Sequence, residues 1–346
     1  MGIKQDVFGL EQIYRLQIEG QWSTKGDVWL SPSPFIAAHP FGYFGGGENK
    51  STVDRIDYSN DTATASVKGP LSLARGYVAA TGNASFGYFG GGYPSISTID
   101  RIDYSNDTPT AVAKGPLSAA RHSLAASGNS SFGYFGGGGP SVISTVDRID
   151  YSNDTPTAVE KGPLHFSARA LAATGNSSFG YFAGGAGPLS SVSRIDYSND
   201  TPTASPKGPL SASRTYLAAT GNASFGYFGG GGQPAASSRV DRVDYSNDTA
   251  TAAAKGPLSQ ARSNSAATGN ASFGYFGGGY PSISTIDRID YSNDTPTAVA
   301  KGPLSAARHS LAASSSRANA ITDPTLFPAP TVRENVAPQG TDFGYF

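Results

Sequence analysis

The sequence predicts an all-β fold, a β-propeller of seven four-stranded blades, from three observations. A block of about 46 residues recurs along the chain, which is a length typical of solenoids, propellers and arrays. Short apolar runs within it are separated by glycine, proline and asparagine, which favour turns between strands. The two ends of the chain also resemble the two parts of one further block. The FGYF element of the block begins at Phe41, Phe86, Phe132, Phe179, Phe225 and Phe273, and its YSNDT element begins at Tyr58, Tyr104, Tyr151, Tyr197, Tyr245 and Tyr291.

The ends of the chain favour a closed ring over an open array. Residues 343–346 read FGYF, and residues 11–18 resemble the VDRIDY element. A linear solenoid caps its ends, whereas a ring can join terminal strands in one blade and so remove two free sheet edges. Seven units account for about 322 residues, and the surplus matches residues 315–341, which break the pattern. We therefore expect one propeller domain over residues 1–346. Its last blade is closed by the N-terminal and C-terminal strands together and carries a Pro-rich insertion at residues 315–341.

Each block divides into four predicted strands. Small residues, as in residues 217–222, suit the innermost strand, where blades crowd toward the axis. The following SFGYFGGG run alternates rings with glycine, as expected where neighbouring sheets approach closely. Residues 52–58 are predicted to form the third strand, in which successive side chains lie on opposite faces of the sheet, and a turn at residues 59–61 follows. Residues 62–65 are expected to form the outer strand, and residues 68–70 lead to the next blade.

The composition of the chain argues against several classes of function. Charged residues make up 15% of the chain, the net charge is −1, and each block balances its own charges, so a basic nucleic-acid-binding face is not expected. The absence of cysteine excludes disulfides and thiolate metal sites. The start of the chain lacks the apolar core of a secretory signal, and no apolar run approaches transmembrane length, so neither signal-directed export nor membrane insertion is expected.

The block resembles kelch repeats. An arginine, a short apolar strand, an aromatic strand that ends in glycines and a third strand with a tyrosine are shared over nearly the whole chain. The outer-strand tryptophan of kelch repeats is missing from the six intact blocks, since Trp22 and Trp29 lie only in the N-terminal partial block. The sequence pattern FGYFGGG…STVDRIDYSNDT…KGPLS also resembles that of repeat proteins of tailed phages of marine bacteria. That resemblance implies a structural or fibre-like role.

Two segments of the chain are identical. Residues 79–127 and 266–314 match at all 49 positions, four blocks apart. Packing alone does not require this identity, so recent duplication or recombination between repeats is the simplest explanation. Selection for rapid change in a host-recognition protein and neutral duplication would both explain this identity.

The blocks differ mainly in two sets of loops. Loops after the second and fourth strands vary, whereas the TGN(A/S)S and YSNDT turns are nearly constant. In a four-stranded blade the two variable sets share one face, and function on loops of a rigid scaffold is common. We expect this variable face to meet a partner, with unconstrained drift of the loops as the alternative. Its candidate partner-binding residues are Asn49, Lys50, Tyr77, Tyr93, His122, Tyr216, Gln233, Tyr280 and His309.

The residue patterns do not indicate a metal site or an active site. Asp57, Asn60 and Asp61 could supply oxygen ligands to calcium, but a turn explains them equally well. An active site would break the repeat, and no cysteine is present for a kelch-like copper site. We expect no enzyme, no cofactor and no metal. The arginine of each block is expected to pair with a third-strand aspartate or to stack on a tyrosine: Arg75, Arg121, Arg169, Arg214, Arg262 and Arg308.

The segment 315–341 offers a second contact region. Its prolines favour an extended path, either as a surface loop or as an arm that docks on a neighbouring subunit through Leu326, Phe327 and Arg333. The arm and the N-terminal segment 1–10 are the candidate contacts of a homo-oligomer.

The sequence predicts a structural or adhesive virion protein. It would form part of a phage tail, fibre or other appendage, be assembled in the host cytoplasm, and contact other virion proteins or a host-surface glycan or protein. The alternative is a free bacterial lectin-like or scaffold propeller that binds glycans or proteins.

Overall fold

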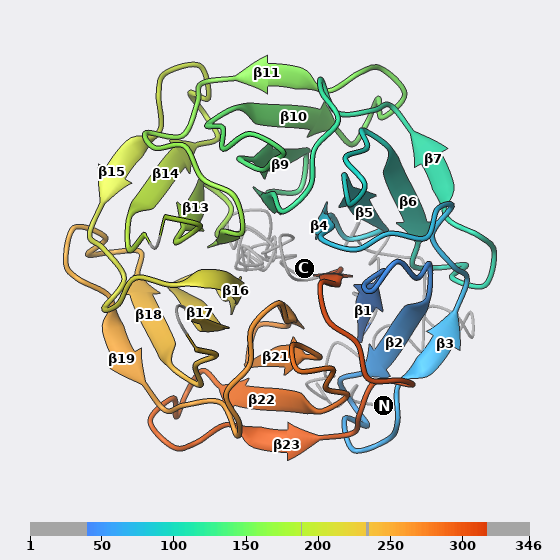
Figure 1. The fold of residues 1–346 in the computed structure, drawn as a ribbon, viewed down its shortest axis with the longest axis vertical. Coiled ribbons are helices and arrows are strands. Elements are labelled where there is room, and N and C mark those ends of the chain that lie inside the picture. The colour runs from blue at the N-terminus through green and yellow to red at the C-terminus, as the bar shows by residue number, and fades with distance from the viewer. Residues whose placement is uncertain (1–39, 188, 233–234, 317–346) are drawn as a thin grey trace, which may run out of the picture. The chain divides into compact units, whose positions relative to one another are not determined.

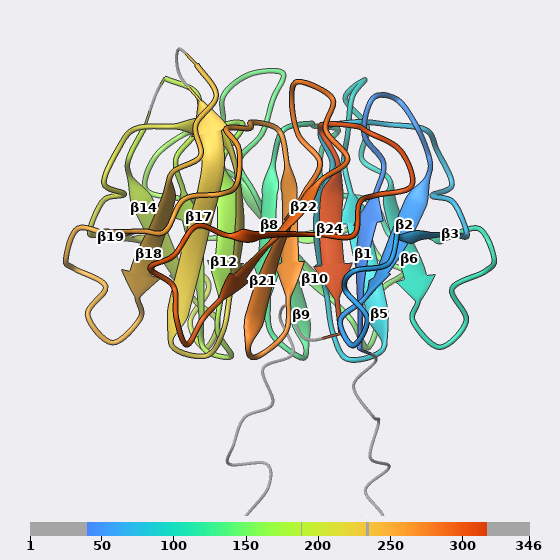
Figure 2. The same ribbon diagram turned by 90° about the horizontal axis from the view of Figure 1, so that it is seen from below.

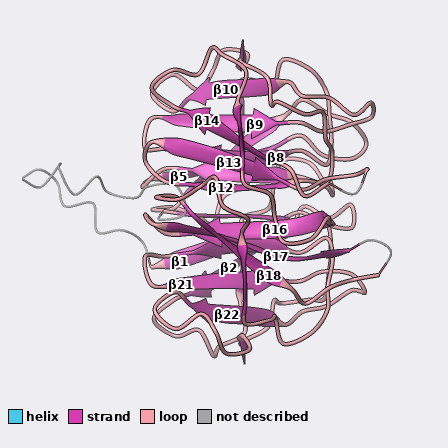
Figure 3. Ribbon diagram, turned by 90° about the vertical axis from the view of Figure 1, so that its left-hand side faces the viewer, coloured by secondary structure: helices cyan, strands magenta, loops and turns pink. Residues whose placement is uncertain are grey.

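The described part of the chain forms six four-stranded antiparallel β-sheets, arranged as blades around a central axis (Figure 1). The computed structural model describes residues 40–187, 189–232 and 235–316, which belong to one compact unit. These residues are all-β and form a propeller, as the sequence predicts, and Figure 3 shows only strands and loops in them. No helix in these ranges is long and apolar enough to cross a membrane.

Each blade places its first strand beside the axis and its short fourth strand at the rim (Figures 1 and 2). From the axis outward, blade 1 contains β24 (Ala312–Ser315), β1 (Phe41–Gly45), β2 (Val53–Asp57) and β3 (Ser66–Lys68), and blade 2 contains β4 (Ala79–Gly82), β5 (Phe86–Gly90), β6 (Ile99–Asp103) and β7 (Val112–Lys114). Blade 3 contains β8 (Ala125–Gly128), β9 (Phe132–Gly136), β10 (Val146–Asp150) and β11 (Val159–Lys161), and blade 4 contains β12 (Ala172–Gly175), β13 (Phe179–Ala183), β14 (Val192–Asp196) and β15 (Ser205–Lys207). Blade 5 contains β16 (Thr215–Gly221), β17 (Phe225–Gly232), β18 (Val240–Asp244) and β19 (Ala253–Lys255), and blade 6 contains β20 (Ala266–Gly269), β21 (Phe273–Gly277), β22 (Ile286–Asp290) and β23 (Val299–Lys301).

The prediction of seven blades is wrong. β24 pairs antiparallel with β1, in a register that places Ala313 opposite Phe44. Among the described residues, β1 has no inner strand before it in the sequence, and β24 has no FGYF strand after it. Their pairing completes a sixth blade from strands at opposite ends of the described chain. Residues 11–18 and 343–346, from which the seventh blade was predicted, lie outside the described residues, as does the insertion from residue 317 onward; Ser315 belongs to β24.

The junction that closes the ring has the same contacts as the other junctions. Between blades 6 and 1, Tyr275 Oη donates a hydrogen bond of 3.0 Å to Asp61, and Arg288 lies 2.7 Å from the same carboxylate. Between blades 1 and 2, Tyr43 and Arg55 contact Asp107 at 2.9 and 2.7 Å. Blade 6 therefore docks directly on blade 1.

Asp61 keeps its charge at this junction. Burial raises the pKa of its carboxyl group, but hydrogen bonds from Lys301 and Tyr275 and the charge of Arg288 outweigh burial, so the pKa lies below its usual value. The carboxylate therefore remains available to join blades 6 and 1 at neutral pH.

The hydrophobic core consists of layers between neighbouring blades. One layer joins Tyr43 and Val53 of blade 1 to Phe89 and Ile102 of blade 2. Glycines of the FGYFG strand permit this close approach: a Cβ added to Gly45 would lie 2.7 Å from the ring of Phe89. The alternation of rings and glycines in the sequence thus reflects packing between sheets.

The outer strand lies later in the block than the sequence suggested. Residues 62–65 were expected to form it, but β3 spans Ser66–Lys68. The reason is the anchoring of Asp61 to blade 6, where its carbonyl also accepts a hydrogen bond of 2.8 Å from the Gly302 amide. Residues 62–65 then lead from this anchor to β3, whose Lys68 pairs with Val53 in the sheet.

Candidate functional site

The two sets of variable loops meet on one face of the ring. Isolated β-bridges join Gly76 to Tyr93 in blade 2, His122 to Gly139 in blade 3 and Ser263 to Tyr280 in blade 6. In each case the tip after the second strand lies against the segment before the first strand. The variable side chains of neighbouring blades are thereby gathered near the axis.

A closed ring of backbone hydrogen bonds surrounds the axis on this face. Each blade contributes one residue, whose amide donates to the carbonyl of the equivalent residue in the preceding blade at 2.7 to 2.9 Å. All six have φ between 53° and 60°, a conformation uncommon for residues other than glycine. These hydrogen bonds give each of the six backbone amides an acceptor near the axis. Its members are Tyr77, Ser123, Ala170, Tyr216, Asn264 and Ser310.

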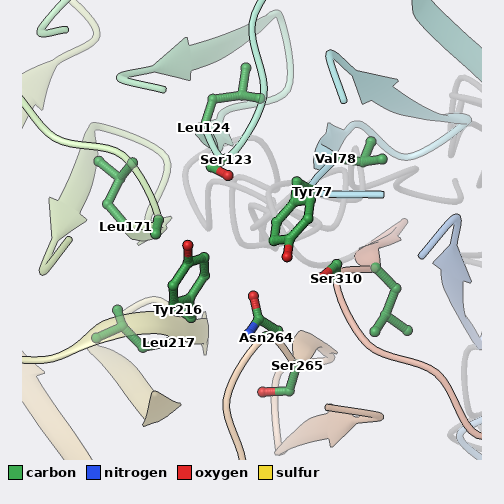
Figure 4. A pocket seen from close by; sticks show the side chains of 12 residues that line it. Tyr77, Val78, Ser123, Leu124, Leu171, Tyr216, Leu217, Asn264, Ser265 and Ser310 are labelled. Atoms are coloured by element: carbon green, nitrogen blue, oxygen red, sulfur yellow. The ribbon is translucent and has the colours of Figure 1, made fainter. Parts of the chain in front are cut away.

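Side chains of this ring line the axial opening. Figure 4 shows Tyr77, Tyr216 and Asn264 pointing into it from different blades. The narrow space at the ring has a volume of about 60 Å³. A wider cavity of about 320 Å³, here called the bowl, is lined in part by three members of the hydrogen-bonded ring, Tyr77, Ser123 and Tyr216. The bowl is lined by Tyr77, Tyr93, His122, Ser123, Arg169 and Tyr216.

Aromatic rings are close to one another in the bowl. The centroid of the Tyr77 ring lies 6.2 Å from the centroids of both His122 and Tyr216. The Tyr93 ring meets His122 edge-on at 5.6 Å. The four rings come from blades 2, 3 and 5, so the lining is asymmetric although the scaffold repeats.

The arginine of the bowl results from a break in the repeat. In five blades an arginine before the first strand pairs with a third-strand aspartate, and both are buried, as with Arg75 and Asp100 at 3.0 Å. Blade 4 has Ala168 and Ser193 at the equivalent positions, and Ser193 Oγ bonds instead to His165 Nδ1 at 2.6 Å. The expected pairing therefore holds for five arginines and is wrong for Arg169. Arg169 is shifted by one residue, because it lies eight positions after Lys161 whereas Arg75 lies seven after Lys68.

Arg169 is a cation without an anionic partner among the described residues. It is partly buried, and no described carboxylate forms an ion pair with it. Its Nε atom is buried and has no hydrogen-bond partner there. Burial lowers the pKa of His122, and the charge of Arg169 lowers it further, so His122 is neutral at neutral pH. The bowl thus presents one fixed positive charge beside uncharged rings.

The second copy of the duplicated segment forms a related but different cluster. Tyr280 and His309, which correspond to Tyr93 and His122, lie 5.8 Å apart between their ring centroids. Here a carboxylate of the chain itself is present: Glu48 accepts hydrogen bonds from Ser282 Oγ at 2.6 Å and from the His309 amide at 3.2 Å. His309 Nε2 lies 3.6 Å from the same carboxylate.

The structure brings together four of the residues predicted from sequence: Tyr77, Tyr93, His122 and Tyr216. Tyr280 and His309 belong to the Glu48 cluster, while Asn49 and Lys50 are exposed, with Lys50 paired to Glu48 at 3.5 Å. Gln233, Leu326, Phe327 and Arg333 lie outside the described residues. Sequence reasoning missed Ser123 and Arg169 as lining residues. The one-residue shift of Arg169, together with Ser193 in place of aspartate, was the signal that could have identified Arg169.

The predicted turn residues have structural partners. Asp57 accepts hydrogen bonds from the amide and hydroxyl of Ser59, at 2.8 and 2.6 Å. Asp61 holds the closing junction. Within residues 40–316, the described residues contain no group of three or more histidine, aspartate or glutamate side chains placed to hold a metal ion.

Comparison with known proteins supports the β-propeller fold. No family model matches the chain, and no curated protein matches it. Among solved structures, that of YjhT superposes with a TM-score of 0.59 at 12% sequence identity, over 70% of this chain and 88% of YjhT. At this identity the likeness shows a shared β-propeller fold.

Proposed function

We propose that this chain is a non-enzymatic adhesive propeller of a virus particle, which presents its variable face to a host-surface glycan or to another virion protein. The observation that carries the binding role is the bowl: residues that differ between blades converge on one cavity, on a scaffold whose contacts repeat from blade to blade. Rigid scaffolds with variable loops are typical of recognition proteins. The place in a virion is inferred from the resemblance of the repeats to phage proteins.

The lining of the bowl favours binding over catalysis. None of its six residues is a carboxylic acid or a cysteine, so the bowl holds neither paired carboxylates nor a thiol nucleophile. Tyrosine rings offer apolar faces and hydroxyl groups at low entropic cost, which suits recognition.

Removal of two tyrosines tests the binding role. We expect the purified chain to compete with particles for adsorption to host cells, and the variant Tyr77→Ala/Tyr216→Ala to need at least a tenfold higher concentration. Ala170 occupies the equivalent ring position with the same backbone conformation, so alanine is compatible with the fold there. Ser130→Ala on the constant, opposite loops is the matched control, because Ala84 occurs naturally at the equivalent site. Equal competition by the tyrosine variant and the wild type would contradict the role of the bowl.

Immunogold electron microscopy tests the place in a particle. Label at discrete positions of phage particles is the expected result. Label only on cells or in the medium would overturn the virion assignment and favour the competing proposal, a free bacterial lectin-like or scaffold propeller that uses the same bowl.

A further inference from the structure

We propose that the bowl binds an acidic monosaccharide unit, a uronic acid, whose carboxylate pairs with Arg169 beside His122. This inference deepens the proposed function by naming the class of ligand. It rests on three observations: a cation without a partner among the described residues, an equivalent carboxylate site elsewhere in the same chain, and the size and lining of the bowl.

Arg169 has the chemistry to recognise a carboxylate. A guanidinium group offers two parallel donors to the two oxygens of a carboxylate, and the pair is strongest where water is partly excluded. The missing ion pair distinguishes Arg169 from the other repeated arginines, since their buried Nε atoms also have no hydrogen-bond partner among the described residues. The equivalent arginines of the other five blades each pair with a buried aspartate, so the substitution of Ser193 for aspartate and the shift of the arginine occur together.

The duplicated segment shows where a carboxylate fits. In the second copy, the Glu48 carboxylate is held by Ser282, by the His309 amide and beside the His309 ring. Alignment of the blocks places Gly139 of blade 3 at the position of Glu48 in blade 1. Beside His122 the chain therefore supplies no carboxylate of its own from this position.

The space beside Gly139 faces both groups of the proposed site. A Cβ added to Gly139 would lie 3.2 Å from His122 Cε1 and 3.6 Å from Arg169 Cδ. Gly76 occupies the position of Arg169 in the blade that follows the Glu48 cluster. The surroundings of the first copy thus lack the internal carboxylate and contain a cation, which is the charge pattern expected for an external carboxylate.

The rest of the bowl suits a sugar ring. A volume of 320 Å³ corresponds to roughly ten water molecules at about 30 Å³ each, which is room for a single ring and not for a folded peptide element. Tyr77, Tyr93 and Tyr216 supply flat apolar faces and hydroxyl groups, and Ser123 adds a further hydroxyl. A ligand with a carboxylate, several hydroxyls and an apolar ring face matches this lining.

Calorimetric titration of the full chain with sodium glucuronate, with glucose as the neutral probe, tests the proposal. Saturable binding of glucuronate, with glucose at least tenfold weaker, is expected. Arg169→Gln should weaken glucuronate binding at least tenfold without a change in melting temperature, because Arg169 has no ion pair with a described residue to lose. Arg239→Gln is the matched control: this exposed arginine carries the same charge, lies outside the bowl and contacts Ser211.

A gain-of-carboxylate variant provides a second arm. Gly139→Glu adds a carboxylate at a residue whose Cβ would lie beside both His122 and Arg169, and it should abolish glucuronate binding while Arg169 remains. Equal binding of glucose and glucuronate, no binding of either, or full glucuronate binding by Arg169→Gln would each overturn the proposal. These outcomes use the purified chain only, so they are independent of whether the protein is found on a particle.

Discussion

Replacement of Arg75 by alanine is expected to destabilise the propeller by about 3–5 kcal/mol, because it leaves the Asp100 carboxylate buried without its cation. Both side chains are fully buried, and Arg75 also donates a hydrogen bond of 2.9 Å to the Phe89 carbonyl. Urea unfolding at neutral pH measures the change in free energy of unfolding.

The chain supplies its own control for this experiment. Blade 4 folds with alanine and serine at the two positions, and His165 bonds to Ser193 in place of the ion pair. The triple variant Ser72→His/Arg75→Ala/Asp100→Ser reproduces that arrangement in blade 2. It should recover at least half of the stability that Arg75→Ala loses, since no buried charge remains. A single variant that costs less than about 1 kcal/mol, or a triple variant no more stable than the single one, would contradict this account of the ion pair.

Gly302→Ala is expected to destabilise the propeller by about 3 kcal/mol or more, which lies at the upper end of overpacking costs. A Cβ on Gly302 would lie 1.9 Å from the Ala63 carbonyl oxygen, across the junction of blades 6 and 1. That atom belongs to the backbone, so blade 1 must move away to relieve the contact. The equivalent glycines at the other five junctions have the same contact, which explains why the KGP sequence recurs in every block.

Gly76→Ala is the control for Gly302→Ala. The nearest atom to an added Cβ at Gly76 is 3.3 Å away, so the change should alter the free energy of unfolding by less than about 1 kcal/mol. Thermal unfolding of both variants measures the difference. Similar melting temperatures for the two would show that the blades tolerate a wider junction than the structure indicates.

The repeat and its first three strands were predictable because they depend on local patterns. Gly42 and Gly45 lie among the aromatic residues of the second strand, as close packing between sheets requires. The number of blades was not predictable in this way. Residues 11–18 look like part of a block, yet β24 pairs with β1 and completes the ring without them. The sequences of β1 and β24 are those of a second and a first strand, but they do not show that these two strands pair with each other.

The candidate site was predictable only in part. Variation between blocks identified Tyr77 and Tyr216, because their positions differ around the ring. The hydrogen-bonded ring was not foreseen, since a positive φ at a tyrosine has no sequence signature. The repeat pattern groups Arg169 with the structural arginines, but one extra residue places it at the position that His122 occupies in its own blade, where it lines the bowl.

The six-bladed ring is the central claim, and a shortened chain of residues 40–316 tests it most directly. These residues contain every strand and every junction described here. Calorimetry should show one cooperative unfolding transition, with a midpoint within about 2 °C of that of the full chain, which corresponds to about 1 kcal/mol. Loss of cooperative unfolding, or a fall of more than about 15 °C, would show that the ring needs strands from outside this range and would contradict closure by six blades.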